Sequence, residues 1–233
     1  MSVSYKLISK FYGLLDIIYF KKNHNNPRYI LADKIPNNVS KLLEIAIGTA
    51  ENSILLAKEK RNINIIGIDL SKEMLDIAKD KIVKNNIQNI ELIKMDGLNM
   101  DFSLETFDYI IISLLLHELT EDISNKMLLE CKRVLKENGK IYVLEWESPK
   151  KFIQKIMFCI IKILEPKSFK KFIKKDLNKY FNKNGFEIKS IDYGDYSKII
   201  ELKKMRKRHI TNGIRKLPCS GNLGYTKPQS GVR

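Results

Sequence analysis

Apolar residues in the middle of the chain fall into short runs that alternate with stretches of helical spacing. The short runs, which predict strands, occupy residues 41–47, 63–69, 90–95, 109–115 and 140–145. The stretches with apolar residues every three or four positions, which predict helices, include residues 51–60, 72–85 and 124–135. Strands that alternate with helices are typical of βαβ units. The pattern therefore predicts an α/β fold with a doubly wound, mostly parallel sheet.

Two further strand-like segments near the carboxyl end are connected differently. Residues 187–193 and 198–203 are separated by only the four residues 194–197. A link this short joins antiparallel strands, because a parallel crossover needs about a dozen residues or more. We therefore expect an antiparallel hairpin to complete a seven-stranded sheet. At the other end of the chain, helical spacing over residues 5–20 predicts an amphipathic helix within a helical cap at 1–40.

The last part of the chain changes in composition. Residues 213–233 contain four of the eleven glycines, two of the six prolines and no acidic residue, without helical or strand periodicity. We therefore expect one domain over residues 1–211 and a disordered extension over 212–233, which is either native or foreign to the domain. A basic arm based at residues 206–208 is the functional alternative.

Charge is distributed unevenly along the 233 residues, whose formal net charge is +15. Residues 1–40 carry +4, residues 41–149 carry −5 and residues 150–233 carry +16. This distribution disfavours a uniformly basic nucleic-acid-binding domain and favours an ordinary core with a basic appendage. The three cysteines lie far apart and form no CxxC pair, which argues against disulfides and structural zinc and favours a cytoplasmic location. No apolar run approaches the roughly 20 residues of a membrane-spanning helix.

The first predicted strand leads into a small-residue turn that is typical of nucleoside-binding sites. The turn follows Glu44 and contains Gly48, and Asp69 ends the next strand 21 residues after Gly48. Such a turn lets backbone approach a ligand, and an acid at that strand end accepts hydrogen bonds from ribose hydroxyls. Glu51 places negative charge where a dinucleotide's phosphate would lie. The sequence therefore indicates a nucleoside without phosphate. The structural alternative is an ordinary strand-to-helix turn, with Asp69 as a helix N-terminal acid.

With these residues, the chain resembles the class I S-adenosylmethionine-dependent methyltransferases over about residues 5–204. It is most similar to the small-molecule and lipid group that includes the ubiquinone and menaquinone biosynthesis methyltransferases. Glu44 and Gly48 match that family's [D/E]-x-G-x-G-x-G motif, and Ala46 and Ala50 replace the outer glycines. Alanine fits these positions if the backbone keeps φ negative. The resemblance implies a Rossmann-like fold.

Four more segments match the family in the same order as its motifs. They are Asp69, residues 95–102, residues 107–118, and residues 133–140 followed by the final hairpin. The resemblance implies that S-adenosylmethionine is the cofactor and that Asp96 accepts from the adenine amine. The cofactor-binding residues that it implies are Glu44, Ala46, Gly48, Asp69, Leu70, Asp96, Gly97 and Ser113. No metal-ligand cluster is expected.

His117 is the candidate catalytic base, because it follows the fourth strand at the edge where ligands bind. A base is needed only if the methyl acceptor loses a proton. The alternative for His117 is a polar residue past a buried strand without a catalytic duty, and Glu118 is interpreted as a solvated charge at a helix start. No D/N-P-P-Y segment follows the fourth strand, which argues against DNA as the substrate.

The basic last third suggests the type of acceptor. Lys151, Lys155 and Lys162 fall on one side of an apolar helical stretch, and a second apolar stripe follows among lysines, within an insertion at 150–184. The resemblance implies that this insertion helps to cover the substrate site. We expect a small-molecule or lipid-like acceptor and peripheral contact with anionic membrane, beside the plainer alternative of a solvated lysine face. An RNA or protein substrate and a non-catalytic nucleoside-binding scaffold are the competing hypotheses.

Overall fold

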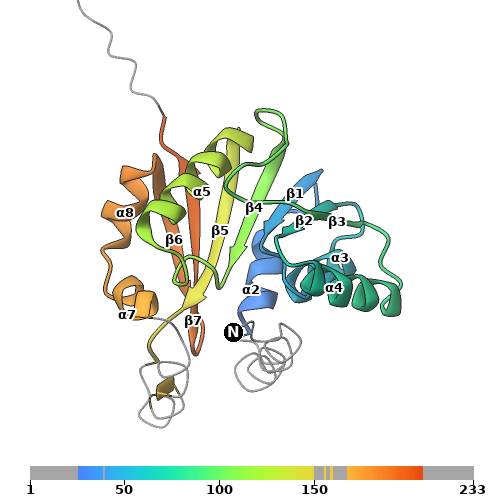
Figure 1. Ribbon diagram of the computed structural model, residues 1–233, viewed down its shortest axis with the longest axis horizontal. Helices are drawn as coiled ribbons and strands as arrows, with labels where there is room; N and C mark the ends of the chain where they lie inside the picture. Colours follow the sequence, from blue (N-terminus) through green and yellow to red (C-terminus); the bar gives the residue numbers. More distant parts are fainter. Residues whose placement is uncertain (1–25, 39, 150–154, 156–157, 160–166, 207–233) are drawn as a thin grey trace, which may run out of the picture.

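The strands form one seven-stranded sheet with the order β3-β2-β1-β4-β5-β7-β6 in the computed structural model (Figure 1). The structure describes residues 26–38, 40–149, 155, 158–159 and 167–206. The strands are β1 (Lys41–Ile45), β2 (Asn64–Asp69), β3 (Ile90–Lys94), β4 (Phe107–Ser113), β5 (Leu135–Trp146), β6 (Phe186–Tyr193) and β7 (Ser197–Lys204). Strands β1 to β5 pair in parallel, whereas β7 is antiparallel to both β5 and β6. The predicted α/β class and the antiparallel final hairpin are confirmed.

The fifth strand is longer than its apolar run predicts. It begins at Leu135, directly after a helix, and Leu135 pairs with Phe107 of β4. The register then shifts between Phe107 and Tyr109, and Tyr109 pairs with Lys140. Residues 135–139 therefore belong to the strand, although they have the composition of a turn. Gly139 fits there because a Cβ at this position would lie 2.8 Å from the carbonyl oxygen of Asp108.

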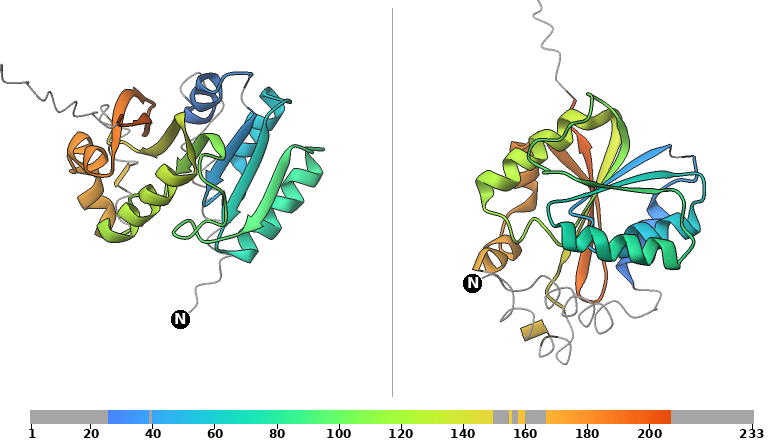
Figure 2. Two further views of the ribbon diagram at one scale, coloured as in Figure 1. Left: turned by 90° about the horizontal axis from the view of Figure 1, so that it is seen from above. Right: turned by 45° about the vertical axis from the view of Figure 1, so that its right-hand side comes forward.

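Helices cover both faces of the sheet (Figures 1 and 2). They are α2 (Pro27–Lys34), α3 (Glu51–Glu59), α4 (Lys72–Lys84), α5 (Glu121–Val134), α7 (Lys167–Ile173) and α8 (Leu177–Lys183). Hydrophobic contacts place α2, α3 and α4 on one face and α5, α7 and α8 on the other. Helix α2, where the sequence predicts no separate helix, begins at an Asn-Pro pair in which the Asn26 side chain caps the first turn.

The central strand β4 shows why its apolar run is continuous. Ile110 and Ile112 pack with α5, while Ile111 between them packs with residues of α2 and α3. All three are fully buried because both faces of a doubly wound sheet are covered. The two cores therefore fix β1 and β4 side by side, with their carboxyl ends at one edge.

Several predictions concern residues outside the described ranges. They are the helix at 5–20, the lysines at 151 and 162, most of the first half of the insertion, and the tail at 212–233. Among the described residues, no helix has the length and apolar character needed to span a bilayer.

Candidate functional site

A cavity of about 680 Å³ opens at the carboxyl ends of β1 to β4. This is the edge at which open α/β sheets bind ligands, beside the point where the strand order reverses between β1 and β4. Eight residues predicted from the sequence line this one cavity: Glu44, Ala46, Gly48, Asp69, Leu70, Asp96, Gly97 and Ser113. They come from segments up to 69 residues apart, which the sheet brings together.

The turn after β1 has an unusual backbone. Ala46, Gly48 and Ala50 have φ values of +52°, +56° and +62°. The two alanines therefore do not keep the negative φ under which alanine would replace glycine without strain. Hydrogen bonds hold the turn, because the Ile47 N–H donates to the Ile68 carbonyl at 3.0 Å and the Ala50 N–H to the Ile47 carbonyl at 3.0 Å.

Asp69 connects this turn to the end of β2. One carboxylate oxygen accepts the Gly48 N–H at 2.9 Å, and the other accepts the Ser71 N–H at 2.9 Å. After β3, Asp96 accepts the Leu98 N–H at 2.9 Å, which fixes the chain around Gly97. Two carboxylates thus lie at the ends of neighbouring strands, and hydrogen bonds from backbone N–H groups orient each of them.

Glu44 is a buried acid in a polar network. Its carboxylate accepts hydrogen bonds from the Asn52 amide at 2.8 Å and from the Ser53 hydroxyl. Burial raises the pKa of Glu44 above its ordinary value, and the bonds to Ser53 and Asn52 and the charge of Arg28 oppose that rise. Asn52 also donates to the Ser113 hydroxyl at 2.8 Å, so the network joins β1, α3 and β4.

The cavity is predominantly acidic. Its described lining contains the carboxylates of Glu44, Glu51, Asp69, Asp96 and Glu118 against the cations Arg28 and Lys81. Lys81 forms an ion pair with Glu51 at the start of α3 and donates to Thr49 Oγ1 at 3.0 Å. An acidic lining favours a cationic ligand and disfavours phosphate, as the sequence indicates for Glu51.

One end of the cavity is apolar. Its lining there is formed by Leu114, Leu115, Leu119, Ile123 and Trp146. Trp146 also packs in a cluster with Phe158 and Phe169, which anchors α7 beside this end. The cavity thus combines a polar part at β1 to β3 with an apolar part beyond β4.

His117 lies behind the cavity wall. It is 1% exposed and is not among the described residues that line the cavity. Its Nδ1 lies 2.6 Å from Oε2 of the buried Glu145, whose other oxygen accepts the Leu116 N–H at 2.8 Å. The Phe169 ring meets His117 edge-on at 5.5 Å. This pair ties the segment after β4 to the end of β5, and the role of His117 as a base stays a prediction.

These residues fit S-adenosylmethionine. The ligand carries a sulfonium and an ammonium, for which the carboxylates provide negative charge. Its ribose hydroxyls and its adenine amine are hydrogen-bond donors, and the carboxylates of Asp69 and Asp96 can accept hydrogen bonds from such groups. The positive φ at Gly48 allows close approach of backbone to the ligand.

The residues that line the cavity and that sequence reasoning did not identify include Arg28, Asn52 and Trp146. They come from α2, α3 and β5. The Asn-Pro pair before Arg28 is a sequence signal for the start of a helix, which could have predicted α2. Nothing in the local sequence indicates that the Arg28 side chain lies at the cavity. Asn52 and Trp146 have the composition of ordinary helix and strand positions.

Comparisons with known proteins find similar methyltransferases. Residues 42–139 match the family described as "Methyltransferase domain". The chain is 27% identical to a demethylmenaquinone methyltransferase of Staphylococcus haemolyticus over 241 residues, which cover 98% of this chain and 94% of the relative. It is 36% identical to a ubiquinone/menaquinone biosynthesis C-methyltransferase of Rickettsia prowazekii over 127 residues, about half of each protein (52% and 50%).

A solved structure, a SAM-dependent methyltransferase from Aquifex aeolicus, shares the fold with a TM-score of 0.61. It is 18% identical to this chain, and the match covers 80% of this chain and 91% of that one. The cavity, its acidic lining and these similarities lead to one conclusion: the chain carries a methyltransferase domain over residues 42–139 and is an S-adenosylmethionine-dependent methyltransferase.

Proposed function

We propose that this methyltransferase acts on an apolar, quinone-like small molecule. The observation that carries the proposal is the apolar end of the cavity, where four aliphatic side chains and Trp146 extend beyond the cofactor-binding part. An apolar ring and side chain would bury there without leaving polar groups unpaired. The printed names of the relatives, demethylmenaquinone and ubiquinone/menaquinone methyltransferases, support the same class of acceptor.

The eight residues that meet at the cavity are proposed to hold the cofactor. Asp69 with Leu70 would bind the ribose, Asp96 with Gly97 the adenine, and the turn at Ala46 and Gly48 would lie against the ligand backbone. Glu44 and Ser113 lie at the remaining end, toward the apolar pocket. When bound, S-adenosylmethionine supplies a methyl group already activated by a positive sulfur, so the protein's main task is to align the acceptor with it.

Two side chains near the apolar end are candidates for taking a proton from the acceptor. His117 is the base that the sequence favours, and its contact with Glu145 suits a histidine whose Nδ1 carries the proton. Glu118 is exposed and lines the cavity itself. We propose His117 as the base. Turnover that falls in Glu118→Gln but not in His117→Ala would transfer that role to Glu118.

A methyl-transfer assay tests the acceptor class. The purified protein is incubated with S-adenosylmethionine and a short-chain demethylmenaquinone in reduced form, and S-adenosylhomocysteine and methylated product are measured by mass spectrometry. We expect Leu119→Asn, which puts an amide in the apolar lining, to lower turnover while S-adenosylhomocysteine still binds. Leu129→Asn is the matched control, because Leu129 is 66% exposed on α5 outside this lining. Turnover with polar acceptors but none with the quinone would contradict the proposal.

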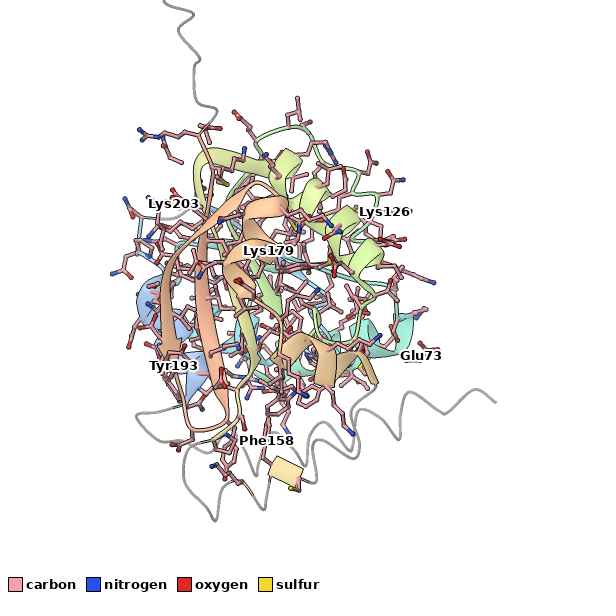
Figure 3. The ribbon with its side chains drawn as sticks, turned by 90° about the vertical axis from the view of Figure 1, so that its left-hand side faces the viewer. Glu73, Lys126, Phe158, Lys179, Tyr193 and Lys203 are labelled. Atoms are coloured by element: carbon pink, nitrogen blue, oxygen red, sulfur yellow. The ribbon has the colours of Figure 1, made fainter. Side chains whose placement is uncertain are left out.

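We further propose that α7 and α8 contact anionic membrane next to the apolar end. Phe169 and Phe181 of these helices are buried, whereas five lysines on the two helices and in the link between them are exposed and are called the lysine face: Lys170, Lys171, Lys174, Lys179 and Lys183. Figure 3 views this side, with Lys179 between Lys126 and Lys203. Ser168 of α7 donates to the Glu118 carbonyl at 3.4 Å, so the lysine face adjoins the cavity rim. A lipid-like acceptor could then enter from the bilayer.

Vesicle binding tests this surface. Vesicles that contain phosphatidylglycerol should bind the protein, and phosphatidylcholine vesicles or high salt should release it, because each lysine near an anionic surface contributes about 1 kcal/mol. Lys170→Glu with Lys171→Glu should weaken binding. Lys79→Glu with Lys84→Glu, an equal charge change on exposed positions of α4 at the other end of the sheet, should weaken it less. Equal effects of the two pairs, or tighter binding to RNA than to vesicles, would refute this surface.

A further inference from the structure

The chain turns sharply at Leu114, the first residue after β4. Leu114 has φ +51°, in the left-handed region that favours glycine. Its N–H donates to the Leu144 carbonyl of β5 at 2.8 Å, and the Glu118 N–H donates to the Leu115 carbonyl at 3.0 Å in the turn that follows. A leucine in this backbone conformation costs free energy that a glycine would avoid. Such a residue at the edge of a cavity points to a function of its side chain.

The side chain of Leu114 lies between the cavity and an aromatic cluster. It lines the apolar end of the cavity, and it also packs against the cluster formed by Trp146, Phe158 and Phe169. The ring centroids of Trp146 and Phe158 are 6.4 Å apart, and those of Phe158 and Phe169 are 6.0 Å apart. Trp146 is only 2% exposed, so neighbouring residues cover almost all of it. Leu114 is therefore part of the wall that separates the cavity from these rings.

The other two leucines of the apolar end pack in a different direction. Leu115 and Leu119 also line the cavity, but they pack against the main core between the sheet and α5. Among the described residues, only Leu114 and Trp146 belong both to the cavity lining and to the aromatic cluster with its packing partners. Shortening Leu114 would therefore extend the cavity toward flat aromatic rings, whereas shortening Leu115 would extend it toward the main core.

A wall at the end of an apolar pocket limits the size of the ligand that fits, because packed protein interiors yield little. The hydrogen bond from the Leu114 N–H to β5 fixes the backbone from which this part of the wall projects. We propose that Leu114 is a specificity-determining residue that limits the size of the acceptor's ring system, an inference that rests on the proposed acceptor class. Its side chain holds the acceptor ring away from Trp146. A ring system with one more fused ring is therefore excluded.

Tryptophan fluorescence measures binding at this end of the cavity without a need for turnover. Trp146 is the one tryptophan of the 233 residues, so a quinone bound beside it quenches the fluorescence of the whole protein. The probes are a naphthoquinone and an anthraquinone that carry the same short side chain and differ by one fused ring, titrated with S-adenosylhomocysteine present. The wild-type protein should bind the naphthoquinone at least about 10-fold more tightly. Leu114→Ala should remove most of that difference by strengthening the binding of the anthraquinone.

A second leucine of the lining provides the matched control. Leu115→Ala removes the same atoms from the cavity wall, but on the side of the main core. It should change both affinities by a similar factor and leave their ratio unchanged. If Leu114→Ala does not fold, Leu114→Gly gives the same comparison, because glycine suits the positive φ at this position.

The outcomes separate this inference from the proposed function. Equal wild-type affinities for the two quinones, or a ratio that shifts as much in Leu115→Ala as in Leu114→Ala, overturn the inference while the acceptor class stands. If the ratio shifts in Leu114→Ala alone but the protein methylates no hydroquinone, the inference stands and the proposed function fails. If neither quinone binds to the wild-type protein, both fail.

Discussion

Replacing Ala46 with glycine should stabilise the protein, although glycine substitutions usually destabilise. Ala46 has φ +52°, and an L-residue in this left-handed region costs about 1–2 kcal/mol. Glycine avoids that cost but gives the unfolded chain more freedom, which offsets about 0.4–1 kcal/mol. Ala46 is only half-buried, so its methyl group contributes little by burial. The expected net gain in the free energy of unfolding is therefore about 0.5–1 kcal/mol.

Two other alanines give a graded comparison. Ala50 has φ +62° but is fully buried against Ile47 and Ile54, so losing its methyl costs about 0.8 kcal/mol and Ala50→Gly should be nearly neutral. Ala57 lies inside α3 and is 3% exposed. Ala57→Gly should destabilise by about 1.5–2 kcal/mol, the sum of helix propensity and lost burial.

Urea unfolding followed by circular dichroism measures the three differences, and melting temperature gives a second reading. For a protein of this size, 1 kcal/mol shifts the melting temperature by about 2–4 °C. The decisive comparison is the sign of Ala46→Gly against that of Ala57→Gly. If both lower stability by similar amounts, the left-handed backbone at residue 46 carries no cost, and the reasoning from φ is refuted.

Three further predictions concern the cavity and the segment behind it. Asp69→Ala should weaken S-adenosylhomocysteine by at least about 1–3 kcal/mol, with the exposed Asp76→Ala as control, and unchanged affinity in a folded protein would remove the ribose assignment. Burial raises the pKa of Glu44 above 4.5, so the folded state holds that proton more tightly and stability falls as pH rises from 4.5 through the raised pKa. Glu44→Gln should flatten this part of the curve of unfolding free energy against pH. If denaturant titrations give the same slope for the wild type and the variant, the raised pKa of Glu44 is contradicted. His117→Ala should lower turnover and leave cofactor affinity nearly intact. If cofactor affinity, measured by calorimetry, falls by the same factor as turnover, the role of His117 is structural.

The sequence by itself determined the fold class and the group of residues at the cavity. Short apolar runs that alternate with helical stretches are buried when helices cover both faces of a parallel sheet. Ile110 and Ile111, which pack on opposite faces of β4, show this arrangement. Parallel strands end at the same edge of the sheet, so residues at or just after their carboxyl ends, such as Asp69 and Asp96, necessarily lie at one cavity. These results depend on local pattern and connectivity, both of which are written along the chain.

Only the tertiary structure decided the rest of the site. Arg28 donates to Asn52, and Asn52 donates to Glu44, because two helices on one face of the sheet bring these side chains to the end of β1. The spacing of the three residues in the sequence does not indicate these contacts. The left-handed backbone at Ala46 and the burial of His117 against Glu145 likewise depend on neighbours from other strands. Side-chain direction and backbone strain are settled by packing between segments that are distant in sequence, and local periodicity does not record such packing.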